Sequence, residues 1–280
     1  MSNLSQHTPA TVLDEYLVAV LDILGIKNMM ANADDQTLNH MSVCFSEALQ
    51  RCNEDVRKHH HKELESLGKS DFKEVYDSLY NESKFLTFSD TLVLTLNLSK
   101  MPAQTPRSSN AATSLFFAKV RYATNALYCY GLPVRGCIDI GTLLWRDNFI
   151  FGKPFANAFS ISDALDFSGV VVTDQVMERF RSSPIDAISV LQKCRLPVPI
   201  KGCQKDVYMH CVDWMGFYYE NKGCIDTQEL FSKFCMHGKL ITGAIERKIR
   251  NTEYILREMK SQADYLADNR THPLKNYTAN

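Results

Sequence analysis

The stretch Tyr16-Leu17-Val18-Ala19-Val20-Leu21-Asp22-Ile23-Leu24-Gly25 decides the fold of this chain. Its apolar run predicts a hydrophobic strand, and Gly25 predicts a turn that opens a helix. Asp22 therefore lies where the strand meets the turn. An unpaired charge among residues of this kind is costly to bury, which favours a bound cation as its partner. The alternative is a strand-end carboxylate that caps the next helix.

A second aspartate stands at a comparable place. The segment Lys84-Phe85-Leu86-Thr87-Phe88-Ser89-Asp90-Thr91-Leu92-Val93-Leu94-Thr95-Leu96 predicts two strands folded at Ser89-Asp90. If these strands adjoin the first one in an antiparallel sheet, the carboxylates of Asp22 and Asp90 reach the same edge. Two oxygen ligands beside a glycine turn suit Mg²⁺ or Mn²⁺ bridging to a triphosphate, which is phosphoryl-transfer chemistry. The alternative for Asp90 is an ordinary turn residue.

Length and composition exclude several classes of protein. The chain has 280 residues, of which 45% are hydrophobic and 22% charged, as in an ordinary globular protein. A formal net charge of -1 argues against a nucleic-acid partner bound through a broad basic surface. The nine cysteines form no Cys-x-x-Cys pair and favour a reducing cytoplasm. No membrane partner is expected, because no apolar run is long enough to span a bilayer and the N-terminus lacks a signal-peptide pattern.

The order of the remaining patterns predicts an α/β fold with a ferredoxin-like βαββαβ core. Helices are expected at 37–53, 71–80, 113–130, 156–167 and 186–194 and from Asp226 onward, strands at 133–141, 149–151, 170–173 and 207–212, and a loop at 99–112. Asp226 and Thr227 are candidate caps for the first C-terminal helix.

The chain is expected to have four parts. They are an N-terminal arm at 1–12, a catalytic domain at 13–214, a C-terminal helical extension at 215–268 and a loose tail at 269–280. Histidines 59–61 lie in a solvated, charged stretch, and three consecutive helical residues do not share one ligand face. Asp139, in the strand at 133–141, is expected to face solvent or to pair locally.

These stretches together resemble the catalytic domain of class III nucleotidyl cyclases. Leu21-Asp22-Ile23-Leu24-Gly25-Ile26 stands in place of the first metal-binding segment of that family, and Ser89-Asp90 in place of its Gly-Asp hairpin. The later elements that match are Arg135-Gly136-Cys137-Ile138-Asp139-Ile140-Gly141, Phe151-Gly152-Lys153 and Ile200-Lys201-Gly202. The resemblance covers about 13–212, and the order of the motifs carries it.

The positions that depart from the family's motifs indicate which group of cyclases the chain resembles. Leu86 and Phe149 occupy the two positions at which purine cyclases read the base, and neither side chain can hydrogen-bond a purine edge. Ala156 and Ser160 stand where the family has an asparagine and an arginine, although Asn157 lies one residue away. The chain is most similar to the bacterial pyrimidine cyclases of the Pycsar antiphage system, which are short, stand alone and keep both metal aspartates.

The resemblance implies a specific reaction and site. UTP or CTP would become a 3′,5′-cyclic nucleotide and pyrophosphate, in a homodimer whose product is read by a separate effector protein. Asp22, Asp90 and the Ile23 carbonyl would hold two Mg²⁺ or Mn²⁺ ions, with Arg135 as a third catalytic residue. Nucleotide-binding roles are implied for Leu24, Gly25, Ile26, Lys27, Leu86, Phe149, Asn157 and Lys201.

Two other functions stay open on the sequence. The missing asparagine and arginine would suit an inactive cyclase-like module that binds nucleotide or dimerises, although such a module has no chemical reason to keep both aspartates. The other is a different two-metal phosphoryl-transfer enzyme on a related sheet. Arg135 equally fits an outward position on a half-exposed strand.

Overall fold

The sheet is built around the strand that carries Asp22. The computed structural model describes residues 13–66, 77–78, 80–81, 83–100, 106–146, 149–181, 191, 195–215, 226–239 and 241–271. Its strands are β1 (Asp14–Ile23), β2 (Ser83–Phe88), β3 (Thr91–Asn97), β4 (Val134–Arg146), β5 (Phe149–Gly152), β6 (Gly169–Val172), β7 (Leu196–Val198) and β8 (Val207–Cys211). They form one sheet in the order β2-β3-β1-β4-β6-β8-β7, with β5 paired to β4.

The first four strands form the predicted βαββαβ core. β1 runs antiparallel to both β3 and β4, and β2 pairs with β3. The α/β fold class is therefore confirmed by the strand order. In this register Asp22 lies between Thr91 of β3 and Arg135 of β4. Gly136 allows the close pairing beside it, since an added Cβ would lie 2.5 Å from the Leu21 side chain and 2.7 Å from the Val20 carbonyl oxygen.

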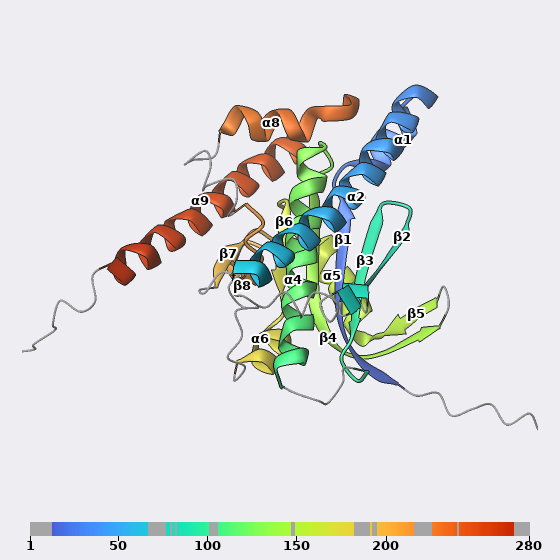
Figure 1. Cartoon of the computed structure of the whole chain (residues 1–280). Coiled ribbons are helices and arrows are strands. Elements are labelled where there is room, and N and C mark those ends of the chain that lie inside the picture. Colours follow the sequence, from blue (N-terminus) through green and yellow to red (C-terminus); the bar gives the residue numbers. More distant parts are fainter. Residues whose placement is uncertain are drawn as a thin grey trace, which may run out of the picture.

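Helices cover both faces of the sheet (Figure 1). The long helices α2 (Asp35–Ser66) and α4 (Pro106–Cys129) pack on one face with α6 (Asp174–Phe180), while α5 (Lys153–Ala164), α8 (Thr227–Cys235) and α9 (Gly243–Thr271) pack on the other. Two short elements complete the set, α1 (Ile26–Asn32) and the 3₁₀ turn η3 (Met236–Gly238).

β1 contributes to both cores because its side chains alternate. Leu17, Ala19 and Leu21 belong to the core under α2 and α4, whereas Val18 and Val20 belong to the core under α5 and α9. Asp22 continues the second series at the end of the strand. Its carboxylate therefore lies on the sheet face that α5 and α9 cover.

Most predicted elements are present, with shifted ends. The loop prediction at 99–112 is wrong in its second half, because α4 begins at Pro106. Proline fits the first turn of a helix, where its missing N–H has no partner to lose, so the Pro-rich composition marked a helix start. The cap at Asp226 is confirmed, since its side chain accepts a hydrogen bond from the Gln228 amide. The helices predicted at 71–80 and 186–194 fall mostly outside the described residues.

Candidate active site

Asp22 and Asp90 lie together at one end of the sheet. Asp90 is in the two-residue turn between β2 and β3, and its carbonyl oxygen accepts a hydrogen bond from the Ile23 amide at 3.0 Å. The turn needs the left-handed backbone of Ser89, with φ of 56°. Both carboxylates line one cavity of about 170 Å³, as the sequence predicted. The cavity is lined by Asp22, Ile23, Leu24, Gly25, Ile26, Lys27, Asp90, Arg135, Lys201 and Lys248.

Arg135 is held by carboxylates on both sides. Its Nε and Nη2 atoms lie 2.9 and 2.7 Å from Asp22 Oδ2, and Nη2 is also 2.5 Å from Asp163 Oδ1. Nη1 donates to the carbonyl oxygens of Asp163 and Leu165. All three guanidinium nitrogens therefore have partners. This arrangement shows Arg135 on an inward position and orients the Asp22 carboxylate.

The surroundings of the Asp22 carboxyl disfavour its ionised form. Burial raises its pKa above the ordinary value, Arg135 opposes this with a hydrogen bond and a positive charge, and the negative charge of Asp90 raises the pKa further. Two carboxylates that disfavour each other's ionisation are stabilised by a cation between them. The donor set of this cavity therefore fits a hard divalent ion such as Mg²⁺ or Mn²⁺.

Three lysines join Arg135 around this cavity. Lys27 lies in the first turn of α1, Lys201 follows β7, and Lys248 lies on α9. The pKa of Lys248 is lowered first by burial, and also by the positive charges of Lys201, Arg135 and Arg247. The sequence did not predict Lys248 as a site residue, because α9 carries no motif typical of an active site.

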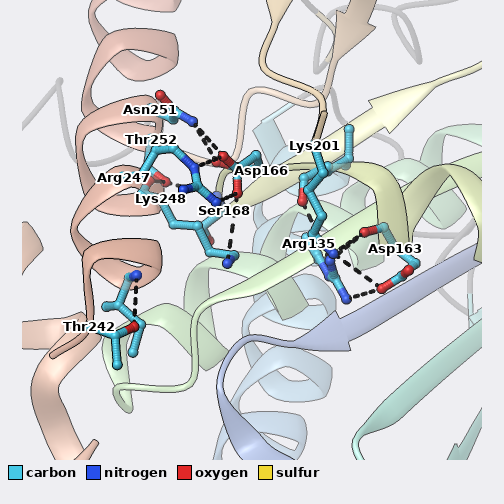
Figure 2. Close-up of polar contacts among 12 residues, drawn as sticks. Arg135, Asp163, Asp166, Ser168, Lys201, Thr242, Arg247, Lys248, Asn251 and Thr252 are labelled. Carbon is cyan, nitrogen blue, oxygen red and sulfur yellow. Dashed lines mark hydrogen bonds and ion pairs between the residues drawn. The ribbon is translucent and has the colours of Figure 1, made fainter. Parts of the chain in front are cut away.

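Carboxylates outside the cavity hold these cations in place (Figure 2). Asp163, at the end of α5, lies 3.3 Å from Lys201 Nζ as well as facing Arg135. Arg135 and Lys201 hold the pKa of Asp163 below its ordinary value although burial acts to raise it. Asp166 is buried and pairs with Arg247 and Lys248 of α9, and Asn251 donates to its carbonyl oxygen at 2.8 Å. This second network fixes α9 beside the site.

Two backbone amides at the end of β1 have hydrogen-bond partners within the chain. The Ile23 amide donates to Asp90, and the Leu24 amide donates to the Pro133 carbonyl oxygen at 2.8 Å. Neither amide is therefore available to a phosphate in this structure, and the nucleotide-binding role implied for Leu24 stays a prediction. Gly25, with φ of 81°, directs the chain from β1 into α1, whose first-turn amides have no partner within the helix.

Three predicted nucleotide-binding residues lie away from this cavity. Leu86 is half-buried on β2 and packs against the core under α5 and α9. Phe149 is 57% exposed on β5 and stacks on Phe151. Asn157 lines a separate cavity of about 930 Å³ beside β4, β5 and α5. Within one chain, therefore, the residues predicted to read the base do not adjoin Asp22 and Asp90.

Asp139 anchors Asn157 in that second cavity. The sequence left two alternatives for Asp139, and the first of them, solvent exposure, does not hold because Asp139 is 2% exposed. It does pair locally, accepting hydrogen bonds from Asn157 Nδ2 at 2.8 Å and Thr173 Oγ1 at 2.6 Å. The hydrogen bond to Asp139 therefore orients the Asn157 side chain in the cavity that it lines.

Comparison with known proteins gives structural similarity alone. No protein-family model matches the chain, and no curated protein does. Among solved structures, the guanylyl cyclase Cya2 is 12% identical with a TM-score of 0.40, over 72% of this chain and 93% of that one. A bacterial light-regulated adenylyl cyclase is 10% identical with a TM-score of 0.39, over 79% and 99%. The adenylate/guanylate cyclase/hydrolase from Silicibacter pomeroyi is 13% identical with a TM-score of 0.34, over 72% and 98%.

No described helix combines the length and apolarity that a membrane crossing requires.

Proposed function

We propose that this chain is a metal-dependent nucleotidyl cyclase. The observation that carries the proposal is the composition of one cavity, where Asp22 and Asp90 face Lys27, Lys201 and Lys248. Two carboxylates suit divalent ions, and a ring of cations suits the triphosphate that such ions accompany. A bound triphosphate would oppose the mutual repulsion that Lys248 shares with Lys201 and Arg135, adding to the effect of the Asp166 carboxylate beside Lys248.

The proposed reaction uses the carboxylates to hold divalent ions and the lysines to hold the triphosphate. The 3′-oxygen of the ribose attacks the α-phosphorus, the bond from that phosphorus to the bridging oxygen breaks, and pyrophosphate leaves with both bonding electrons. The hydroxyl proton passes to solvent. Divalent ions at Asp22, Asp90 and the Ile23 carbonyl would lower the pKa of the hydroxyl and offset charge on the phosphates.

The chain's own residues position the reactants. Lys27, Lys201 and Lys248 would contact oxygens of the β- and γ-phosphates and stabilise the departing pyrophosphate. Arg135 acts through Asp22, keeping its carboxylate turned into the cavity. In this assignment Arg135 is a positioning residue rather than a contact to the nucleotide.

The separation of the two cavities supports a homodimer with composite sites. Asn157 and the exposed aromatic pair Phe149 and Phe151 lie on the β4–β5 side of the molecule, apart from the Asp22 cavity. A second subunit placed over Asp22 would supply them to the nucleotide. Apolar side chains at Leu86 and Phe149 favour UTP or CTP over the purine nucleotides. By its resemblance to the Pycsar cyclases, the product would be an antiphage signal read by a separate effector, made in the cytoplasm.

The test is to incubate the purified protein with each of the four nucleoside triphosphates and Mn²⁺ or Mg²⁺. Products are identified by mass, and Asp22→Asn serves as the matched control. A cyclic pyrimidine nucleotide, absent from the control, is the expected result. Cyclic AMP formed faster than either pyrimidine product would overturn the base assignment and keep the cyclase. Metal-dependent nucleotide binding without turnover would identify the non-catalytic module instead. The ion pair between Arg135 and Asp22 is the observation that favours this second function.

A further inference from the structure

A cluster of two histidines and one cysteine lies outside the proposed active site. His40 and Cys44 are one turn apart on α2, and His237 belongs to η3, which connects α8 to α9. One ligand atom from each residue lies within 4.8 Å of the other two. His40 is exposed, Cys44 is buried and His237 is half-buried, so the group lies at the surface with its thiol inward.

The spacing of these atoms matches tetrahedral zinc. Bonds of about 2.3 Å to sulfur and 2.0–2.1 Å to nitrogen at tetrahedral angles place the sulfur and a nitrogen about 3.6 Å apart. His40 Nε2 and Cys44 Sγ are separated by 3.6 Å. The two imidazole rings lie 5.5 Å apart between centroids. The ligand atom from His237 lies no more than 4.8 Å from those of His40 and Cys44.

The imidazole ring of His237 has a backbone carbonyl as a hydrogen-bond partner. Its Nε2 atom donates to the Tyr130 carbonyl oxygen at 2.7 Å, which leaves Nδ1 as the ring nitrogen with a lone pair. Metal-binding histidines commonly have a backbone carbonyl as the partner of their second nitrogen. The residue also adopts a left-handed backbone, with φ of 63° and ψ of 31°, a conformation that is rare outside glycine and is often found at functional sites.

We propose that His40, Cys44 and His237 bind Zn²⁺, with the fourth position open to solvent. The nitrogen and sulfur donors favour zinc, whereas the carboxylates at Asp22 and Asp90 favour Mg²⁺ or Mn²⁺. The two sites share no residue and are expected to fill independently. This proposal does not depend on the cyclase activity.

The position of the zinc site gives it a structural role. α2 packs on one face of the sheet, and α8 and α9 pack on the other. An ion at η3 therefore joins helices from the two faces at one end of the molecule. Lys239, immediately after η3, is buried and donates to the Gly131 carbonyl oxygen at 2.9 Å. The segment at η3 is therefore already attached to the turn after α4, and the zinc ion would attach it to α2 as well.

The experiment uses the full chain, stripped with a chelator and titrated with Co²⁺ and then with Zn²⁺. Cobalt in a tetrahedral site with a thiolate ligand has visible d–d bands and an ultraviolet sulfur-to-metal charge-transfer band. We expect both bands, their loss when Zn²⁺ displaces the cobalt, and a higher melting temperature with Zn²⁺. Cys44→Ser should abolish the charge-transfer band and weaken Zn²⁺ binding at least tenfold.

Four further variants keep the test specific. His40→Ala changes an exposed side chain, and His237→Asn keeps a residue that tolerates the left-handed backbone; each should weaken Zn²⁺ binding at least tenfold. Cys129→Ser removes an exposed thiol elsewhere and should change nothing. Asp22→Asn should keep the charge-transfer band, which a carboxylate site cannot produce. A charge-transfer band that survives Cys44→Ser, or equal Zn²⁺ affinity in the wild type and His40→Ala, would overturn the proposal.

Discussion

Replacing Asp22 by asparagine removes one negative charge from the cavity and leaves its shape almost unchanged. We expect this substitution to abolish cyclisation. A carboxylate ligand of a two-metal site contributes several kcal/mol of charge stabilisation in the transition state. If the lost contribution is about 4 kcal/mol, the rate falls roughly a thousandfold. Asp90→Asn should have the same effect, because both carboxylates line the same cavity.

The fold should tolerate the loss of Asp22. Arg135 keeps its contacts with Asp163 and with the Leu165 carbonyl oxygen, so no buried charge is left alone. The unfolding free energy is expected to change by no more than about 1 kcal/mol at neutral pH. The sign depends on pH: the folded-state pKa of Asp22 is raised, so the wild type loses stability as pH rises through the interval between the unfolded and folded pKa values. Asp22→Asn lacks this loss.

Pyrophosphate release and product mass measure the activity, and urea unfolding at two pH values measures the stability. Asp174→Asn is the matched control, since it alters an exposed aspartate paired with Arg195 at 3.2 Å. Such surface pairs contribute about 0–1 kcal/mol, and activity should be unchanged. Wild-type turnover by Asp22→Asn at the same metal concentration would refute the assignment of this carboxylate.

Lys248→Met should raise the KM for the nucleoside triphosphate at least tenfold in steady-state assays. Lys205→Met is the control, because it changes an exposed lysine outside the cavity and should leave the KM unchanged. Mixing Asp22→Ala chains with Asn157→Ala chains should restore turnover that neither has alone, and full activity of a diluted monomer would contradict composite sites. Burial lowers the pKa of Lys119 to about 7, so the folded state binds fewer protons than the unfolded state above that pH. Wild-type stability in urea should therefore rise from pH 7 toward pH 10, and Lys119→Met should not show this rise.

The Asp22 cavity was partly predictable because its two carboxylates mark strand ends. The apolar run before Asp22 and the turn at Ser89-Asp90 follow from local periodicity, and neighbouring antiparallel strands bring their ends together. Lys27 was predictable for the same reason, since it follows the Gly25 turn. In each case the signal lies within a few residues of the side chain concerned.

Long-range partners could not be predicted in this way. Lys248 lies at the cavity because the buried Asp166 binds α9, the helix that carries Lys248. The residues near Lys248 in the sequence give no sign of this long-range contact. The Arg135 pairing with Asp22 depends on the register between β1 and β4, which a single strand pattern does not specify. Phe149 and Leu86 carry hydrophobic patterns that fit a base pocket, a core and a subunit contact equally well.

The attachment of α9 through Asp166 has a consequence for synthesis of the protein. Asp22, Asp90 and Arg135 leave the ribosome early, but Lys248 must follow before the cavity has its full set of cations. A nascent chain that carries both aspartates therefore still lacks one lysine of the cavity. Translation that stalls before α9 would release a chain with both aspartates and an incomplete cavity. Under the proposed function, catalysis would therefore begin only after α9 has been translated.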